Sequence, residues 1–255
     1  MKVVGSLLVL AFLAYAAICA LLYFNQRGMI YYPQFTRVDA AQTDFEMQRE
    51  GIVLRGWLLN PGKAKAIVYF GGNGESIQNN RDDFLRWFPD HTVYLVAYRG
   101  YGASDGEPSE PALFADALAV FDRAQSEHPE KPVAVIGRSL GSGVAAHVAS
   151  KRPIDRLVLI TPFDTLADVG QMHYRWLPVR WLATDRYDSV ANLADYQGPL
   201  LVIRAGRDEV IPAANTERLI TSLRKPPQVI VLPSAGHNDL GEDPVYGKAL
   251  TDFLR

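Results

Sequence analysis

One stretch decides the fold: Val133-Ala134-Val135-Ile136-Gly137-Arg138-Ser139-Leu140-Gly141-Ser142-Gly143. Its first four residues are apolar and largely β-branched, which is typical of a buried strand. The residues after it are small and compatible with a helix. Between the two lies Gly137 to Gly141, a match to the pattern G-x-S-x-G. The glycines of this pattern permit a sharp turn that leaves the serine hydroxyl exposed. We therefore expect Ser139 to be a nucleophile on a strand-to-helix turn.

The residue after this serine has a second expected role. In such a turn the backbone N–H of Leu140 points at the oxyanion that forms when the serine attacks a carbonyl group. The other interpretation of the stretch is a glycine-rich turn that only permits close packing. The spacing alone does not separate the two, so the context along the chain has to decide.

Outward from this stretch, apolar runs alternate with helical patterns. Strands are expected over residues 66–70, 92–98, 133–136, 156–162, 200–204 and 228–233. Helices are expected over residues 80–88, 110–126, 140–151, 213–223 and 244–254. Upstream, residues 45–47 and 52–58 form a predicted hairpin. The alternation predicts a mostly parallel sheet flanked by helices on both faces and entered by this antiparallel hairpin.

Candidate site residues fall just past the ends of these strands. The glycine-rich loop 71–76 follows one strand, and Asn73 in it is a second expected oxyanion donor through its N–H. Asp208 and His237 follow the last two strands. Ligands of such sheets sit at the carboxyl ends of the strands, so these residues should meet Ser139. The order serine, aspartate, histidine predicts a triad in which Asp208 orients His237 and His237 takes the serine proton.

Other residues compete for the same roles. The remaining histidines are His91, His128, His147 and His173. Only His237 follows the last strand in a loop, and His173 is its rival because it lies in an irregular segment. The competing acids are Asp164, Asp188 and Glu209. Asp208 has the best placement, two residues past a glycine at a strand end.

The N-terminus carries a different signal. Val3 to Phe24 is an uncharged, mostly apolar run, long enough to cross a bilayer as a helix. A cleaved signal peptide is the alternative, with Ala14 to Ala16 as a cleavage site. Because the run continues past that site, we expect a single-pass membrane anchor over residues 1–25. The usual orientation, with the N-terminus inside, places the rest of the chain outside the cytoplasm.

Composition limits the remaining choices. The 255 residues suit one domain, here 26–255, with 164–198 either a small cap over the site or a segment packed on the core. The net charge of −2 argues against nucleic acid as a partner. A single cysteine, Cys19, rules out an intramolecular disulfide and a thiolate metal site. No metal or cofactor is expected, and the oligomeric state is left open.

Several motifs together resemble a known family. The five matching segments are Tyr69–Gly74, Tyr98–Glu110, Gly137–Gly143, Gly206–Pro212 and Gly236–Asp239. They resemble the membrane-anchored α/β-hydrolases of the Bem46 type, which are related to the ABHD12/13/17 group of animal serine hydrolases. The resemblance covers about residues 25–254. It implies an α/β-hydrolase fold and a triad of Ser139, Asp208 and His237. One departure is Gly71, where family members often have histidine, and this predicts a looser loop around Asn73.

The leading functional hypothesis is a serine hydrolase that cleaves carboxylic esters or thioesters through an acyl-enzyme on Ser139. The anchor and the aromatic segment 173–182 favour a small-molecule or lipid-like acyl substrate. A serine peptidase is the first alternative, because the same triad cleaves amides. The second alternative is a catalytically idle scaffold that binds a partner at the membrane.

Overall fold

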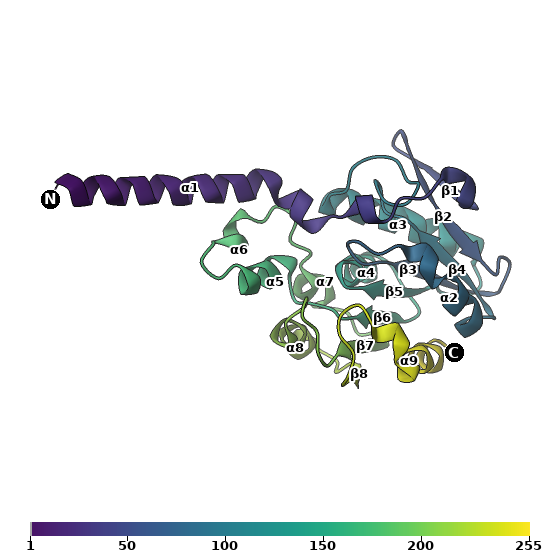
Figure 1. The fold of residues 1–255 in the computed structure, drawn as a ribbon. Coiled ribbons are helices and arrows are strands. Elements are labelled where there is room, and N and C mark those ends of the chain that lie inside the picture. The colour runs from purple at the N-terminus through teal and green to yellow at the C-terminus, as the bar shows by residue number, and fades with distance from the viewer. Residues whose placement is uncertain (1) are drawn as a thin grey trace.

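A twisted eight-stranded sheet forms the centre of the molecule in the computed structural model, which describes residues 2–255. The strand order across the sheet is β1-β2-β4-β3-β5-β6-β7-β8 (Figure 1). The strand bounds are β1 Phe45–Arg49, β2 Ile52–Leu59, β3 Lys65–Phe70, β4 His91–Val96, β5 Ala134–Arg138, β6 Leu157–Ile160, β7 Leu200–Ala205 and β8 Gln228–Leu232. Strands β3 to β8 run parallel to one another, whereas β2 is antiparallel to both β1 and β4.

The antiparallel entry into the sheet is a tight hairpin. Glu50 and Gly51 join β1 to β2 with positive φ angles of 46° and 84°. Two such residues form the turn whose twist matches that of the flanking strands. The parallel strands beyond the hairpin are near-continuous apolar runs because helices cover both of their faces.

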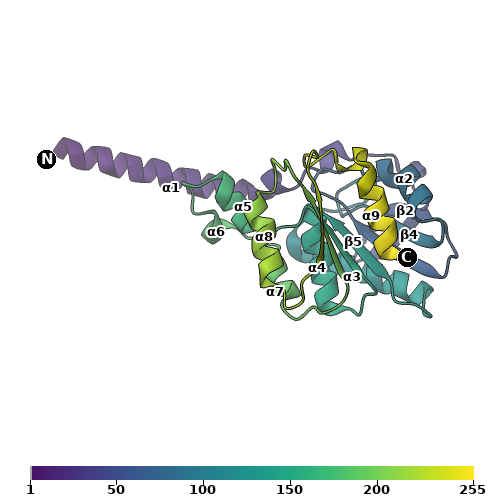
Figure 2. The same cartoon turned by 90° about the horizontal axis from the view of Figure 1, so that it is seen from below.

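Helices lie on both faces of this sheet (Figure 2). The helix α2 Arg81–Trp87 and the C-terminal helix α9 Pro244–Leu254 pack together through Trp87 and Tyr246 on one face. The helices α3 Glu110–Glu127 and α4 Leu140–Lys151 pack against each other on the other face. The remaining elements of the main domain are α8 Ala213–Ser222 and the short 3₁₀ helices Pro33–Phe35, Ala40–Gln42, Ile77–Asn80 and Leu240–Glu242. The predicted mostly parallel sheet flanked by helices is confirmed.

The N-terminal helix α1 runs from Lys2 to Ile30 and projects from the domain as a long rod (Figures 1 and 2). Its 29 residues span about 43 Å. Its most apolar window has a mean hydropathy of 2.6 and is not buried by the rest of the described chain. The helix is therefore long and apolar enough to cross a membrane, and it continues past the apolar run into the domain.

The segment 164–198 forms three short helices. They are α5 Leu166–His173, α6 Val179–Leu182 and α7 Ser189–Leu193. Helix α7 packs against α4, whereas α5 and α6 pack against each other and lie beside α1 (Figure 1). Helix α7 thus packs on the core, and residues 166–183, called the cap below, lie next to the N-terminal helix.

The first turn of α4 approaches the end of β3 so closely that only glycine fits at position 141. A Cβ there would lie 2.0 Å from the backbone oxygen of Phe70. Because backbone has to move to relieve this overlap, we expect Gly141→Ala to lower the free energy of unfolding by about 3 kcal/mol or more. Urea unfolding in detergent measures the loss. Gly241→Ala is the control, since a Cβ at Gly241 meets no atom within 4 Å, and equal losses in both variants would contradict the explanation.

Candidate active site

Ser139 occupies a strained turn between β5 and α4. Its φ and ψ angles are 50° and −119°, a conformation that non-glycine residues rarely adopt. Gly137 permits it, because a Cβ at that position would lie 2.2 Å from the backbone oxygen of Gly141. The turn thus has two features. No side chain fits at Gly137, and Ser139 lies outside the φ and ψ regions of regular helices and strands.

The structure brings Ser139, His237 and Asp208 together. The Oγ atom of Ser139 lies 2.9 Å from Nε2 of His237. The Nδ1 atom of His237 lies 3.0 Å from Oδ1 and 2.9 Å from Oδ2 of Asp208. The three residues come from the ends of β5, β8 and β7, as their places in the sequence predict. A base in this position can take the hydroxyl proton, and a carboxylate on its other nitrogen can hold the correct tautomer.

Asp208 is itself held in place. Its Oδ1 accepts hydrogen bonds from the N–H groups of Val210 and Ile211 at 2.9 and 2.7 Å. The side chains of Asp208 and His237 are each only 8% exposed. These contacts fix the carboxylate in the orientation that the imidazole requires.

The competing histidines lie elsewhere. His91 contacts the backbone oxygen of Leu254, His128 contacts the Tyr94 hydroxyl, and His147 stacks on Phe114. His173, the rival from the cap, contacts the backbone oxygen of Val210 at 2.8 Å. None of these contacts is with Ser139.

The competing acids also have other partners. Asp164 is buried and accepts hydrogen bonds from Asn215 and Arg218 of α8. Asp188 caps α7 through the N–H of Ala191, and Glu209 is exposed at the surface. The geometry therefore favours Asp208 over Asp164, Asp188 and Glu209.

The two expected oxyanion donors lie in the same cavity as Ser139. Leu140 begins α4, where the first N–H groups have no partner inside the helix. Within residues 2–255, neither the N–H of Leu140 nor that of Asn73 donates a hydrogen bond to the protein. Both groups are available to a ligand oxygen, and the carbonyl group of Asn73 is fixed by bonds from the N–H of Tyr32 and the hydroxyl of Tyr101.

The loop around Asn73 is held by Glu75, which the sequence analysis missed. The carboxylate accepts hydrogen bonds from the N–H of Gly72, the hydroxyl of Tyr69 and the side chain of Asn80, each at 2.7 Å. A Cβ at Gly71 would lie 2.6 Å from Ile77 and 3.2 Å from Glu75. Hydrogen bonds to Glu75 and close packing at Gly71 thus hold this loop, and whether histidine at position 71 would make it tighter stays a prediction.

Glu75 also forms an ion pair across the site. Its Oε1 lies 3.2 Å from Nη1 of Arg138, whose Nη2 donates to the backbone oxygen of His237 at 3.1 Å. These two side chains connect the loop of Asn73, the serine turn and the histidine loop. No pattern in the sequence reveals this pair, because its partners are distant in the chain.

The Glu75 ion pair predicts a pH dependence of stability. Burial alone raises the pKa of this carboxyl, but Arg138 and three hydrogen bonds outweigh it and hold the pKa below its ordinary value of 4.5. A depressed pKa stabilises the fold above about pH 4.5, and this contribution is lost as the pH falls through the folded-state pKa. We expect Glu75→Gln to lower the melting temperature at pH 7 and to reduce its fall on acidification. Equal acid sensitivity in the wild type and the variant would contradict this.

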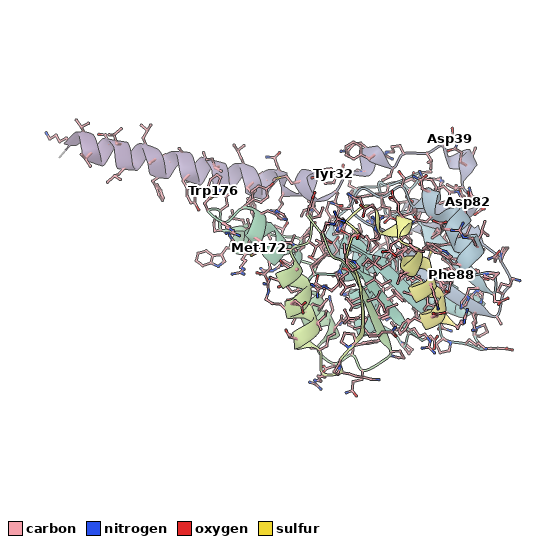
Figure 3. All side chains as sticks on the ribbon, turned by 60° about the horizontal axis from the view of Figure 1, so that its bottom comes forward. Tyr32, Asp39, Asp82, Phe88, Met172 and Trp176 are labelled. Carbon is pink, nitrogen blue, oxygen red and sulfur yellow. The ribbon has the colours of Figure 1, made fainter. Side chains whose placement is uncertain are left out.

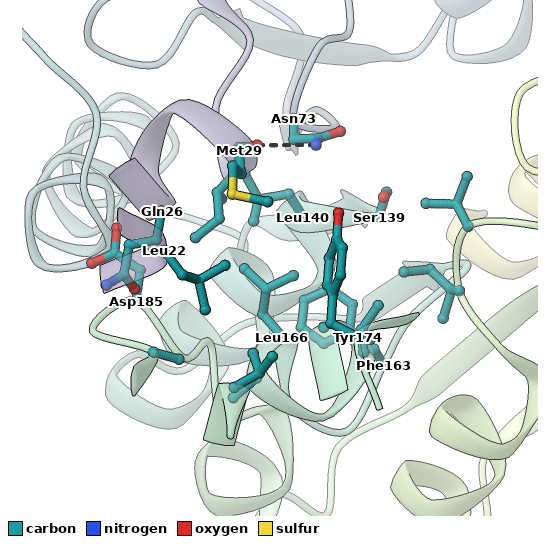
Figure 4. Close-up of a pocket in the computed structure, with 18 of the residues that line it drawn as sticks. Leu22, Gln26, Met29, Asn73, Ser139, Leu140, Phe163, Leu166, Tyr174 and Asp185 are labelled. Atoms are coloured by element: carbon teal, nitrogen blue, oxygen red, sulfur yellow. Dashed lines mark hydrogen bonds between the residues drawn. The ribbon is translucent and has the colours of Figure 1, made fainter. Parts of the chain in front are cut away.

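A largely apolar cavity of about 290 Å³ opens over Ser139 (Figure 4). One wall is the end of α1, from which Leu22, Gln26 and Met29 line the cavity. The cap supplies the opposite wall, including Leu166 and Tyr174. The N-terminal helix was not among the predicted site elements, because nothing in the apolar pattern of this helix indicates which of its residues face the domain.

The end of α1 is fixed to the domain by polar contacts. Gln26 is buried and bonds to the backbone of Leu182 and Thr184 in the cap. The side chain of Asn73 donates to the backbone oxygen of Ile30 at 3.0 Å (Figure 4). The helix therefore contributes to the position of an expected oxyanion donor as well as to the cavity wall. Among residues 2–255, no group of three or more potential metal ligands is present.

Comparison with known proteins places these features in context. The family model described as "Serine aminopeptidase, S33" matches residues 62–183. The uncharacterized protein Rv2307c of Mycobacterium tuberculosis is 35% identical over 244 residues, which cover 91% of this chain and 86% of that protein. The rat lysophosphatidylserine lipase ABHD12 is 33% identical over 167 residues, which cover 57% of this chain and 42% of the lipase.

Solved structures share the architecture. An esterase of Pyrococcus furiosus, Pf2001, superposes with a TM-score of 0.68 at 18% sequence identity. The superposition covers 88% of this chain and 95% of the esterase. At this identity the match concerns the fold.

Proposed function

Since the chain belongs to the α/β-hydrolase superfamily, we propose that it is a serine hydrolase that cleaves carboxylic esters or thioesters through an acyl-enzyme on Ser139. The observation that carries the proposal is the line of contacts from Ser139 Oγ through His237 to Asp208, each within 3.0 Å. A serine hydroxyl becomes a good nucleophile only with such an oriented base.

The proposed reaction has two halves. His237 Nε2 takes the proton as Ser139 Oγ attacks the carbonyl carbon, and the N–H groups of Leu140 and Asn73 bind the oxyanion. The imidazolium then protonates the leaving alcohol or thiol, and the acyl group remains on Ser139. A water that gives its proton to His237 attacks the acyl-enzyme. His237 returns this proton to Ser139 Oγ as the bond to the acyl carbon breaks and the carboxylic acid leaves. Asp208 stays ionised and stabilises the imidazolium throughout.

The cavity supports an apolar acyl group as the part of the substrate that is bound. Its lining includes aliphatic side chains from both walls, such as Leu22, Met29, Leu166 and Val179. Its one acidic residue, Asp185, is occupied, because it accepts a hydrogen bond from Tyr31 and pairs with Arg27 at 3.4 Å. The rat relative is named as a lysophosphatidylserine lipase, which is consistent with an acyl ester as substrate.

A serine peptidase is the second candidate, favoured by the description of the matching family model. An aminopeptidase needs a carboxylate that is free to bind the substrate amine, and Asp185 is not free. The ester hypothesis therefore fits the cavity better. The idle-scaffold alternative gains nothing from the geometry, because all three residues of the proposed triad are in contact.

We also propose that α1 is a single-pass membrane anchor and that the domain lies outside the cytoplasm. The length and the exposed apolar surface of α1 support the anchor. The orientation follows only from the usual preference of such segments. Both proposals concern where the enzyme acts, and the reaction does not depend on them.

Pre-steady-state kinetics test the reaction. With p-nitrophenyl esters of increasing acyl length, we expect a burst of p-nitrophenol and a mass increase on the peptide that contains Ser139. The matching p-nitroanilides should react far more slowly. Faster cleavage of the anilides would favour the peptidase, and turnover without an acylated Ser139 would contradict the proposed mechanism.

A further inference from the structure

We propose that the cap loop from Tyr174 to Leu182 is a second membrane-binding element, which enters the lipid bilayer beside α1. What we call the loop comprises the connection between α5 and α6, which carries Trp176, and the short helix α6 itself, which carries Trp181. Figure 3 shows Trp176 beside α1, on the side of the domain from which the helix projects. The proposal rests on the proposed membrane anchor and not on the serine chemistry.

The contact between Tyr15 and Trp176 shows how far along α1 the loop lies. The hydroxyl of Tyr15 donates a hydrogen bond to the backbone oxygen of Trp176 at 2.9 Å. Tyr15 lies nine residues before Phe24, the end of the apolar run, which corresponds to about 14 Å along the helix. The hydrocarbon core of a bilayer is about 30 Å thick. If the apolar run of α1 spans this core, Trp176 lies below the headgroups.

The second argument is the hydrogen bonding of the loop backbone. A loop that meets lipid has to satisfy its carbonyl groups within the protein, because the hydrocarbon offers no donors. Besides the bond from Tyr15, the side chain of Gln171 donates to the oxygen of Leu177 at 2.8 Å and to that of Tyr174 at 3.3 Å. The side chain of Gln26 donates to the oxygen of Leu182 at 3.2 Å. Three side chains thus supply the bonds that water supplies to an ordinary surface loop.

The third argument is the surface that the loop presents. Trp181 is 89% exposed and Trp176 is 65% exposed, although large aromatic side chains are normally covered. The loop contains Arg175 and Arg180 and no acidic residue. Exposed tryptophan is favoured where a protein meets lipid, and long arginine side chains can extend from below the headgroups toward them. This surface is continuous with the exposed apolar side chains of α1, so a lipid bilayer is the occupant that covers both.

The position of the loop connects the bilayer with the cavity. A groove between α1 and the loop is lined by apolar and aromatic side chains and by three polar ones: Tyr15, Trp176, Leu177, Pro178 and Trp181, with Gln171, Arg175 and Arg180. Gln26 and Leu182, at the base of the loop, line the cavity over Ser139. A lipid that lies in the groove is therefore next to the elements that form the cavity walls.

Tryptophan fluorescence of the full chain tests the docking. The protein is reconstituted into vesicles of dioleoylphosphatidylcholine and into vesicles of the same lipid brominated on its acyl chains, which quenches nearby tryptophans. Two of the four tryptophans, Trp176 and Trp181, lie on the loop. We expect bromination to reduce the emission of the wild type by roughly half and to leave that of the variant Trp176→Phe/Trp181→Phe nearly unchanged.

A matched control places a tryptophan on the far side of the domain. Val245 is exposed at the start of α9, so Val245→Trp in the double-phenylalanine background should give unquenched emission. Equal quenching at position 245 would contradict the proposal, because the effect would not be confined to the loop. If the protein resists carbonate extraction but its loop tryptophans are not quenched, the docking proposal is overturned. This holds whether water, a second copy or another protein covers the loop. Release of the protein by carbonate would overturn the anchor itself and the docking with it.

Discussion

We expect the replacement of Ser139 by alanine to abolish ester hydrolysis and to leave the fold intact. Loss of the nucleophile of a serine triad lowers kcat by about 10⁴- to 10⁶-fold. The side chain is small and its Oγ contacts only His237 among the recorded side-chain partners in residues 2–255, so no packing is lost. Steady-state kinetics with a p-nitrophenyl ester measure the effect, and thermal unfolding in detergent checks the fold. Wild-type turnover in this variant would contradict the assignment of the nucleophile.

A second substitution at the same position separates strain from catalysis. Ser139 has a φ of 50° and a ψ of −119°, which a residue without Cβ adopts more easily. We expect Ser139→Gly to be inactive like the alanine variant and to unfold at a higher denaturant concentration, with a gain of about 1 kcal/mol. The alanine variant is the matched control, because it keeps the Cβ and with it the strain. A less stable glycine variant would mean that the turn is not strained in the protein.

We expect Asp208→Asn to lower kcat far more than Asp164→Asn. Asparagine at 208 can donate to Nδ1 of His237 and so favours the tautomer that cannot accept the serine proton, a change that costs about 10⁴-fold in kcat. The asparagine side chain can still accept hydrogen bonds from the N–H groups of Val210 and Ile211 and stay in contact with His237.

Asp164→Asn serves as the comparison, because both carboxylates follow strands at the same edge of the sheet. Asp164 bonds to Asn215 and Arg218, not to a histidine. We expect this variant to lose about 2 kcal/mol of stability, a typical value for hydrogen bonds to a charged group, and to keep most of its turnover. The opposite ranking in kcat would move the role of the acid to Asp164.

The order of elements was predictable from the sequence. The apolar runs identified all six parallel strands, and the short runs at 45–47 and 52–58 identified the hairpin. Because parallel strands end at one edge, chain order alone was enough to predict that Ser139, Asp208 and His237 meet. The structure places them in contact, whereas their catalytic roles stay predictions until activity is measured.

Contacts between distant segments were not predictable in the same way. The pair of Glu75 and Arg138 depends on β3 lying beside β5, which no local pattern specifies. The apolar run of α1 has almost no polar face. The spacing of polar and apolar residues along it therefore could not show that Leu22 and Met29 face the cavity. The same holds for 164–198, for which the sequence left open whether it covers the site or packs on the core. In the structure α7 packs against α4, and residues of α5 and α6 line the cavity.

The most direct test of the central claim is labelling of the full chain with a fluorophosphonate, which reacts covalently with an activated serine. The account predicts that the wild type is labelled on the peptide that contains Ser139 and that Ser139→Ala is not labelled. It also predicts much slower labelling of Asp208→Asn. A folded wild type that does not react, or a label that persists in Ser139→Ala, would contradict the claim that Ser139 is the nucleophile of a serine hydrolase.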